Sequence, residues 1–162
     1  MNICLAIGIL LGYTLLMIKA GGKVPSSLSA SVFDLKPSQR WIWTVTICVV
    51  CFLCVPTYID KVSENTKFLA FISIAGLAFV GAAPLVNRKD NNMQFQVHQW
   101  GAIVCAVCSQ LVLVFNQPLM LVGWVPFVAY EAYRFRNVKK WRTEVFWAEM
   151  VCFASTFAYC LL

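Results

Sequence analysis

Charged residues are scarce in this chain. They make up 12% of its 162 residues, whereas hydrophobic residues make up 60% and the mean hydropathy is +0.74. A soluble domain has about 25% charged and roughly 45–50% apolar residues. This composition excludes an ordinary soluble domain and predicts a protein whose solvent is lipid. The polar connections are short, so residues 1–162 are expected to form a single integral membrane helical bundle.

Histidine is also nearly absent. The only one is His98, and a single histidine argues against a His-based metal site. The sequence lacks the HExxH, GxSxG and P-loop motifs, and it has no paired aspartates at the depth of the membrane midplane. We therefore predict a non-enzymatic protein without metal or cofactor. A membrane enzyme acting on lipids is the weaker alternative.

Cysteine, by contrast, is abundant, and all eight cysteines lie in apolar segments. Cys48, Cys51 and Cys54 recur every three residues, and Cys105 and Cys108 repeat the spacing. CxxC pairs can bind metals or exchange disulfides. Here no Lys, Arg or His lies close by in the sequence to stabilise a thiolate, so we expect inert, small apolar side chains.

Six apolar runs predict membrane helices, since about 20 apolar residues cross a hydrocarbon core. The predicted spans are residues 2–18, 41–59, 68–86, 98–115, 119–133 and 145–162. The first run could also be a signal peptide, but no basic region precedes it. The fifth is short, and a re-entrant segment is its alternative. The predicted fold class is all-α, a polytopic transmembrane helix bundle of about six spans.

Basic residues are distributed unevenly among the connections. The first, third and fifth hold eleven of the thirteen Lys and Arg residues, and the second and fourth hold two. Because Lys and Arg are retained on the cytoplasmic side, this asymmetry predicts a multi-pass protein with both termini outside. The net charge of +6 then reflects that retention and contact with anionic lipid headgroups. No nucleic-acid partner is expected.

Three ionisable residues lie near the predicted cytoplasmic boundary: His98, Glu131 and Glu149. In one interpretation they form an inward-facing cluster that binds a lipid headgroup, an ion or a proton. In the other, the acids are interfacial and pair with the basic loop, as Glu131 can with Arg134 at i,i+3. The basic residues around the mouth of the cluster are Arg88, Lys89, Arg134, Arg136, Lys139, Lys140 and Arg142.

Other residues within the spans predict helix packing. Gly8 and Gly12 form a GxxxG pattern, which lets a partner helix approach closely and is one candidate interface for a homo-oligomer. Ordinary small residues in a membrane helix are the alternative interpretation. Trp41 and Trp43, which open the second predicted span, are expected in an aromatic belt at the membrane boundary. Six polar residues are expected to form hydrogen bonds between helices: Thr44, Thr46, Ser109, Gln110, Ser155 and Thr156.

Short motifs resemble a known family. SSLSASVF (26–33) precedes the aromatic start of the second span, and GAAP (81–84) is followed by a polar loop and HQWGA (98–102). Over roughly residues 25–115 this resembles the six-span Frag/DRAM/Sfk group and its prokaryotic relatives of unknown function. The resemblance implies a six-helix bundle without known catalysis, a role in membrane-lipid organisation or regulation, and His98 as the matching position. That group usually has its odd-numbered connections on the non-cytoplasmic side, opposite to the orientation predicted from charge.

Two functions from different classes follow. The first is a non-enzymatic integral membrane protein that interacts with lipids or a membrane partner through a basic cytoplasmic face. The alternative is a small transporter or channel subunit that relays ions or protons through the same polar cluster. An inverted repeat would favour transport, but residues 1–86 and 87–162 show no convincing similarity.

Overall fold

The computed structural model describes residues 2–82, 93–137 and 143–162, and every regular element in these ranges is a helix. This confirms the all-α fold class. The α-helices are α1 (Asn2–Gly21), α2 (Trp41–Lys61), α3 (Lys67–Gly81), α4 (Met93–Asn116), α5 (Trp124–Asn137) and α6 (Glu144–Leu161). The 3-10 helices are η1 (Ser29–Asp34), η2 (Pro37–Gln39), η3 (Glu64–Thr66) and η6 (Pro118–Gly123).

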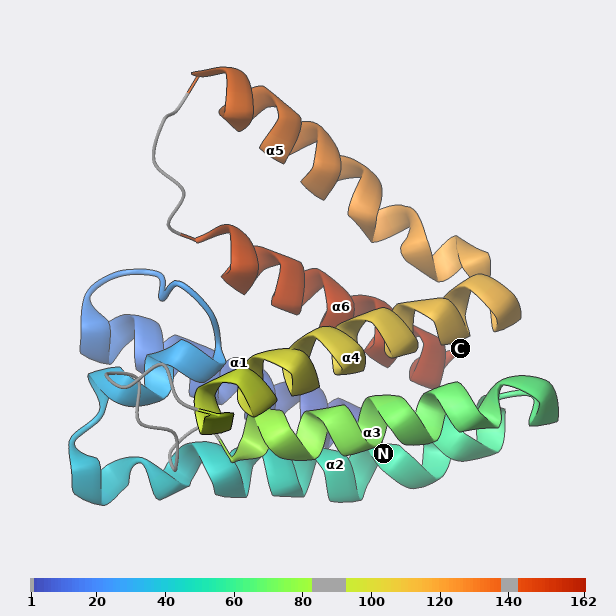
Figure 1. Cartoon of the computed structure of the whole chain (residues 1–162), viewed down its shortest axis with the longest axis horizontal. Coiled ribbons are helices and arrows are strands. Elements are labelled where there is room, and N and C mark those ends of the chain that lie inside the picture. The colour runs from blue at the N-terminus through green and yellow to red at the C-terminus, as the bar shows by residue number, and fades with distance from the viewer. Residues whose placement is uncertain (1, 83–92, 138–142) are drawn as a thin grey trace.

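The helices run back and forth, so their ends gather at two ends of the bundle (Figure 1). α1, α3 and α5 finish at the end where α2, α4 and α6 begin. We call this the basic end. The basic residues that the structure describes at this end include Lys19, Lys23, Lys36, Arg40 and Arg134. The chain termini lie toward the opposite end.

Four of the described helices are long and apolar enough to cross a membrane. They are Asn2–Gly21, Pro37–Lys61, Gln96–Asn116 and Glu144–Leu161. α3 has 15 residues and α5 has 14, which at 1.5 Å per residue gives roughly 22 Å, less than a hydrocarbon core of about 30 Å. Membrane-spanning length is thus confirmed for four of the predicted spans, and the count of six is not.

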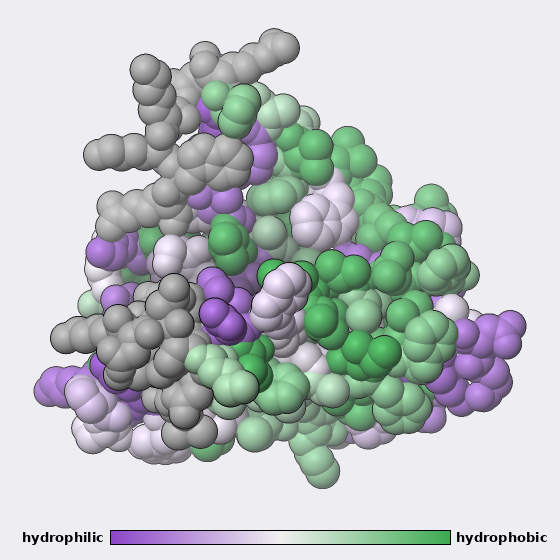
Figure 2. All heavy atoms as spheres, in the orientation of Figure 1, coloured by the Kyte–Doolittle hydropathy of each residue, from purple (hydrophilic) through white to green (hydrophobic). Residues whose placement is uncertain are grey.

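The outer surface of the bundle is apolar. Phe52 is 81% exposed, Phe115 is 65% exposed and Phe68 is 59% exposed. Hydrophobic side chains cover much of the middle of the face in Figure 2, and hydrophilic ones gather mainly toward its two ends. A water-soluble protein rarely exposes so large an apolar surface, whereas lipid solvates it favourably. The surface pattern agrees with the composition.

The closest helix packing is between α3 and α4, and it depends on two glycines. A Cβ added at Gly76 would lie 2.6 Å from the carbonyl oxygen of Gly101 and 2.8 Å from the backbone nitrogen of Cys105. Gly76 therefore lets the two backbones meet. Gly8 and Gly12 differ, because a Cβ at either would have nothing within 4 Å. The predicted GxxxG pair does not mediate close packing within the described chain.

Trp43 corrects the expectation of an aromatic belt. Its side chain is 0% exposed, and its Nε1 donates a hydrogen bond to the carbonyl oxygen of Val80 at 2.9 Å. Thr44 Oγ1 donates to the carbonyl oxygen of Gly81 at the same distance. The last carbonyls of a helix have no partner within it, so α2 satisfies the end of α3. Trp43 belongs to the core.

The boundaries of two predicted spans also change. The fifth was expected at 119–133, but Pro118–Gly123 is a 3-10 helix and α5 begins at Trp124. Pro118 has no backbone N–H and is tolerated in the first turn of a helix, which accounts for the start of the 3-10 helix at this residue. The third was expected to reach 86, but α3 ends at Gly81. Residues 83–86 of the predicted span lie outside the described residues.

Candidate functional site

Residues 28–32 of a serine-rich stretch in the first connection are buried at the basic end, whereas Ser26 is exposed. We call residues 26–32 the serine segment. Leu28 is 1% exposed, and Ser31 and Val32 are 0% exposed. A polar stretch can be buried only if its polar groups find partners. Ser31 Oγ lies 2.9 Å from Tyr13 Oη and donates to the carbonyl oxygen of Leu28 at 2.5 Å.

Glu149 binds the backbone of the serine segment from α6. Its Oε2 accepts a hydrogen bond from the backbone N–H of Leu28 at 2.5 Å. One turn earlier in α6, the backbone N–H of Phe146 donates to the carbonyl oxygen of Ser26 at 3.1 Å. N–H groups in the first turn of a helix lack intrahelical partners, as do those that open a 3-10 helix. α6 and the serine segment therefore satisfy each other's backbone groups.

His98 binds the same segment from α4. Its Nδ1 lies 3.0 Å from the carbonyl oxygen of Phe79, and its Nε2 lies 3.2 Å from Ser29 Oγ. A carbonyl only accepts hydrogen bonds, so we assign the proton to Nδ1. In the neutral ring Nε2 then accepts the hydroxyl proton of Ser29. His98 thereby joins the end of α3, the start of α4 and the serine segment.

Glu131, the third member of the predicted cluster, takes different partners. Its Oε1 lies 3.7 Å from Arg134, which confirms the i,i+3 pair expected from the sequence. Arg134 also lies 2.7 Å from Oε1 of Glu144, on α6. The side chains of this triad are only 13–17% exposed. Glu131 thus contributes to an ionic contact between α5 and α6, and Glu144 is a member that the sequence analysis missed.

The remaining predicted site residues are the other basic residues of the predicted mouth. Arg136 lies in the last turn of α5. The other basic residues of the predicted mouth lie outside the described residues: Arg88, Lys89, Lys139, Lys140 and Arg142.

A polar junction joins α4, α5 and α6 nearer the opposite end. Gln110 Oε1 accepts hydrogen bonds from Trp124 Nε1 at 2.9 Å and from Ser155 Oγ at 3.0 Å. The expected hydrogen bonding between helices is confirmed for Gln110, Ser155 and Thr44. It is wrong for Thr46, Ser109 and Thr156, whose hydroxyls donate to carbonyl oxygens of their own helices. Such hydrogen bonds stabilise helix packing in an apolar medium, because an unpaired amide or indole N–H group there costs free energy.

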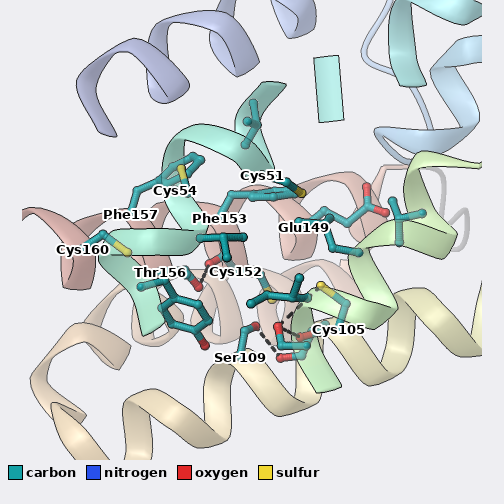
Figure 3. Close-up of a pocket in the computed structure, with 18 of the residues that line it drawn as sticks. Cys51, Cys54, Cys105, Ser109, Glu149, Cys152, Phe153, Thr156, Phe157 and Cys160 are labelled. Atoms are coloured by element: carbon teal, nitrogen blue, oxygen red, sulfur yellow. Dashed lines mark hydrogen bonds between the residues drawn. The ribbon is translucent and has the colours of Figure 1, made fainter. Parts of the chain in front are cut away.

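A partly open cavity of about 120 Å³ lies among α2, α3, α4 and α6. Five of the eight cysteines line it, and Figure 3 shows them around the space, with Glu149 toward one end and Cys160 toward the other. The five are Cys51, Cys54, Cys105, Cys152 and Cys160. All are free thiols, and no group of three metal-ligating side chains occurs among the described residues.

Sequence analysis missed this convergence of cysteines. Glu149, Cys152, Thr156 and Cys160 follow each other at spacings of three and four, which places them on one face of α6. That spacing was the available signal. It could not show that the faces of α2 and α4 bearing Cys51 and Cys105 point to the same space.

Comparison with known proteins gives no match: no family model, curated protein or solved structure is similar to the chain. The resemblance to the Frag/DRAM/Sfk group therefore remains a prediction. Two of the stretches that carry it do lie together, because His98 contacts Ser29.

Proposed function

We propose that this chain is a non-enzymatic, multi-pass membrane protein that binds anionic lipid headgroups at its basic end. The observation that carries the proposal is a set of unpaired lysines. Lys19, Lys23 and Lys36 are exposed and form no ion pair with any described residue. An exposed ammonium near a membrane surface is worth about 1 kcal/mol of attraction to anionic lipids.

Lysines at the opposite end are engaged within the chain. Lys61 donates a hydrogen bond to the carbonyl oxygen of Tyr159 at 3.3 Å, and Lys67 forms an ion pair with Glu64. This contrast between the lysines of the two ends supports a ligand that binds at the basic end. The orientation that we propose, with the basic end in the cytoplasm and both termini outside, rests on the distribution of Lys and Arg along the chain. This orientation also requires α3 and α5 to cross the membrane, in addition to the four longer helices.

The contacts of the serine segment support this proposal over transport. A transporter or channel subunit would use His98 and Glu149 to relay ions or protons. Both ring nitrogens of His98 are hydrogen-bonded, and one carboxylate oxygen of Glu149 holds Leu28. These hydrogen bonds favour a structural role for His98 and Glu149 at the basic end. The exposed lysines then bind the ligand.

Catalysis has weaker support than binding. Ser29 and His98 have the atoms of a serine–histidine pair, in which the imidazole activates the hydroxyl. Ser29 is only 7% exposed, however, and it does not line the cavity among the helices. A nucleophile needs space beside it for a substrate.

Lipid preference of a lysine variant tests the proposal. The protein would be reconstituted in nanodiscs of phosphatidylcholine with a minor share of phosphatidylserine, and the lipids retained after detergent extraction would be counted by native mass spectrometry. In Lys19→Gln/Lys23→Gln/Lys36→Gln the preference for phosphatidylserine should fall by roughly fivefold per lysine. The matched control is Lys61→Gln/Lys67→Gln, which should keep the preference. Equal preference in the two variants would contradict the proposal.

A further inference from the structure

Arg40 lies at the basic end without an anionic partner among the described residues. It directly precedes α2, and its Cζ lies over the ring of Phe33, 5.2 Å from the ring centroid. Its guanidinium forms no ion pair or hydrogen bond with the described part of the chain. Arg134, at the same end, differs, because it lies 2.7 Å from Glu144 and 3.7 Å from Glu131. A guanidinium carries five N–H donors, so those of Arg40 are left for solvent or for a ligand.

The two terminal nitrogens are the accessible part of the Arg40 guanidinium. The residue is partly exposed, and Nε is its enclosed nitrogen without a hydrogen bond. Nη1 and Nη2 are not enclosed in this way, so they keep contact with the surroundings. The ring of Phe33 attracts the cation from one face and orients it. Arg40 is therefore held in place with its two terminal nitrogens accessible.

The acid closest to Arg40 in the sequence does not neutralise it. Asp34 forms no ion pair with any residue in the described ranges. It lies beside the end of α1, where a Cβ added at Gly21 would be 3.6 Å from its Oδ2. Lys36, between Asp34 and Arg40, is exposed and has no described ion pair either. The start of α2 therefore carries two positive charges that no described carboxylate neutralises.

The chemistry of these two side chains favours a terminal phosphate group. Arginine binds phosphate oxygens through two parallel hydrogen bonds, a geometry that an ammonium group cannot reproduce. A terminal phosphate offers three free acceptor oxygens and a charge of about −1.5 to −2. The phosphodiester of phosphatidylcholine or phosphatidylserine offers fewer free oxygens and a lower charge. Only η2 separates Lys36 from Arg40, and a flexible lysine side chain can reach a group that Arg40 binds.

We infer, on the basis of the headgroup site proposed above, that Arg40 selects a terminal phosphate group, which it binds through Nη1 and Nη2 while Lys36 contributes charge. The other exposed lysines attract anionic lipids of any headgroup. Two sources can supply a terminal phosphate: phosphatidic acid in the membrane and a water-soluble phosphate. Arg40 lies near the start of a helix that is long enough to cross a membrane, so the phosphate groups of lipids are within its reach.

Two probes distinguish the sources. In the first, phosphatidylcholine nanodiscs hold the full chain with equal minor shares of phosphatidic acid and phosphatidylserine, and native mass spectrometry counts the lipids retained after detergent extraction. In the second, inorganic phosphate is added at constant ionic strength to the protein in detergent, and the shift in Tm is recorded. The key variant is Arg40→Lys, which keeps the charge and removes the paired N–H groups. Its control is Arg134→Lys, the same substitution at a guanidinium that Glu131 and Glu144 already occupy.

A ratio of retained phosphatidic acid to phosphatidylserine that falls about tenfold in Arg40→Lys, and stays at the wild-type value in Arg134→Lys, would support the inference with a lipid as the source. A rise in Tm with inorganic phosphate that Arg40→Lys loses, without a preference for phosphatidic acid, would support it with a soluble phosphate. Equal responses of the wild type and Arg40→Lys to both probes would overturn it, as would no response to either.

Two further variants complete the test. Phe33→Leu keeps Arg40 but removes the ring that orients it, and should lower the ratio of phosphatidic acid to phosphatidylserine by about threefold. The triple lysine variant separates the role of Arg40 from the proposed headgroup site. If that variant loses the preference for anionic lipids while Arg40→Lys keeps the wild-type ratio, the role of Arg40 is refuted and the headgroup site stands. The opposite pattern would contradict the role of the lysines and support that of Arg40.

Discussion

Glu149 Oε2 accepts a hydrogen bond at 2.5 Å from the backbone N–H of Leu28, a residue 121 positions earlier in the chain. The contact links the last helix to the first connection. Together with the contact of His98 to Ser29, it holds the serine segment against α4 and α6. The first connection, at the basic end, is thereby held against two helices and is not an independent loop.

The Glu149 contact should contribute measurably to stability. Glu149→Leu leaves the N–H of Leu28 buried without a partner, and we expect the free energy of unfolding to fall by roughly 1–3 kcal/mol. Glu149→Gln keeps an acceptor oxygen and should lose less. The measurement is denaturant unfolding in detergent micelles, monitored by near-UV circular dichroism. Equal losses in the two variants would show that the hydrogen bond to Leu28 is not the cause.

Removal of the His98 contacts should loosen the serine segment locally. His98→Ala loses the bonds to Phe79 and Ser29, and we expect faster amide hydrogen exchange in residues 26–32, with a stability loss of about 1–3 kcal/mol. Ser29→Ala loses one of the two bonds and should show a smaller increase. Ser38→Ala, in an exposed part of the same connection, is the control and should exchange like the wild type. Unchanged exchange in His98→Ala would refute the role assigned to this histidine.

The two kinds of glycine should respond differently to a methyl group. Gly76→Ala places a Cβ against the backbone of α4, so the helices must separate, at an expected cost of roughly 1–3 kcal/mol. Gly8→Ala meets no atom within 4 Å and should change stability by less than about 0.5 kcal/mol. Thermal unfolding of the two variants side by side tests this. If two copies pair through Gly8 and Gly12, Gly8→Leu should change the oligomeric state, as measured by light scattering, while leaving the monomer folded.

The triad of Glu131, Arg134 and Glu144 should matter more than an exposed ion pair. Arg134→Gln leaves two mostly buried carboxylates without their cation, and we expect a loss of about 1–3 kcal/mol. Lys67→Gln breaks the pair with Glu64, whose side chain is 83% exposed, and should cost less than about 1 kcal/mol. Chemical denaturation of both variants supplies the comparison. Similar losses in the free energy of unfolding would show that the buried triad stabilises the fold no more than the exposed ion pair does.

Hydropathy predicted the four longest apolar helices well because a long apolar run can be recognised from the local sequence alone. Long uncharged runs correctly indicated α1, α2, α4 and α6, whose lengths suit a membrane. The same criterion placed the end of the fifth helix at 133, whereas α5 continues to Asn137. A charged residue can continue a helix when it has a partner, as Arg134 has in Glu131 and Glu144. A charged residue therefore does not by itself mark the end of a helix.

The end of the bundle at which the candidate site lies was predictable from the sequence, but the directions in which its side chains point were not. Sequence position correctly indicated that His98 and Glu149 lie near the same end of the bundle. It could not show which way each helix is rotated, and so it missed the buried position of Trp43 and the cavity lined by cysteines. Nor could it show that a serine-rich stretch, typical of an exposed loop, is buried through bonds to residues far along the chain.

Orientation tests the central claim, that the basic end faces the cytoplasm and meets anionic lipid. A compartment-sensitive reporter would be inserted at Lys36, in the first connection, and another fused after Leu162, each in the full chain in cells. The account predicts a cytoplasmic signal at Lys36 and an external signal after Leu162. An external signal at Lys36 would contradict it and would restore the orientation usual in the Frag/DRAM/Sfk group. Cytoplasmic signals from both would contradict the six-span arrangement instead.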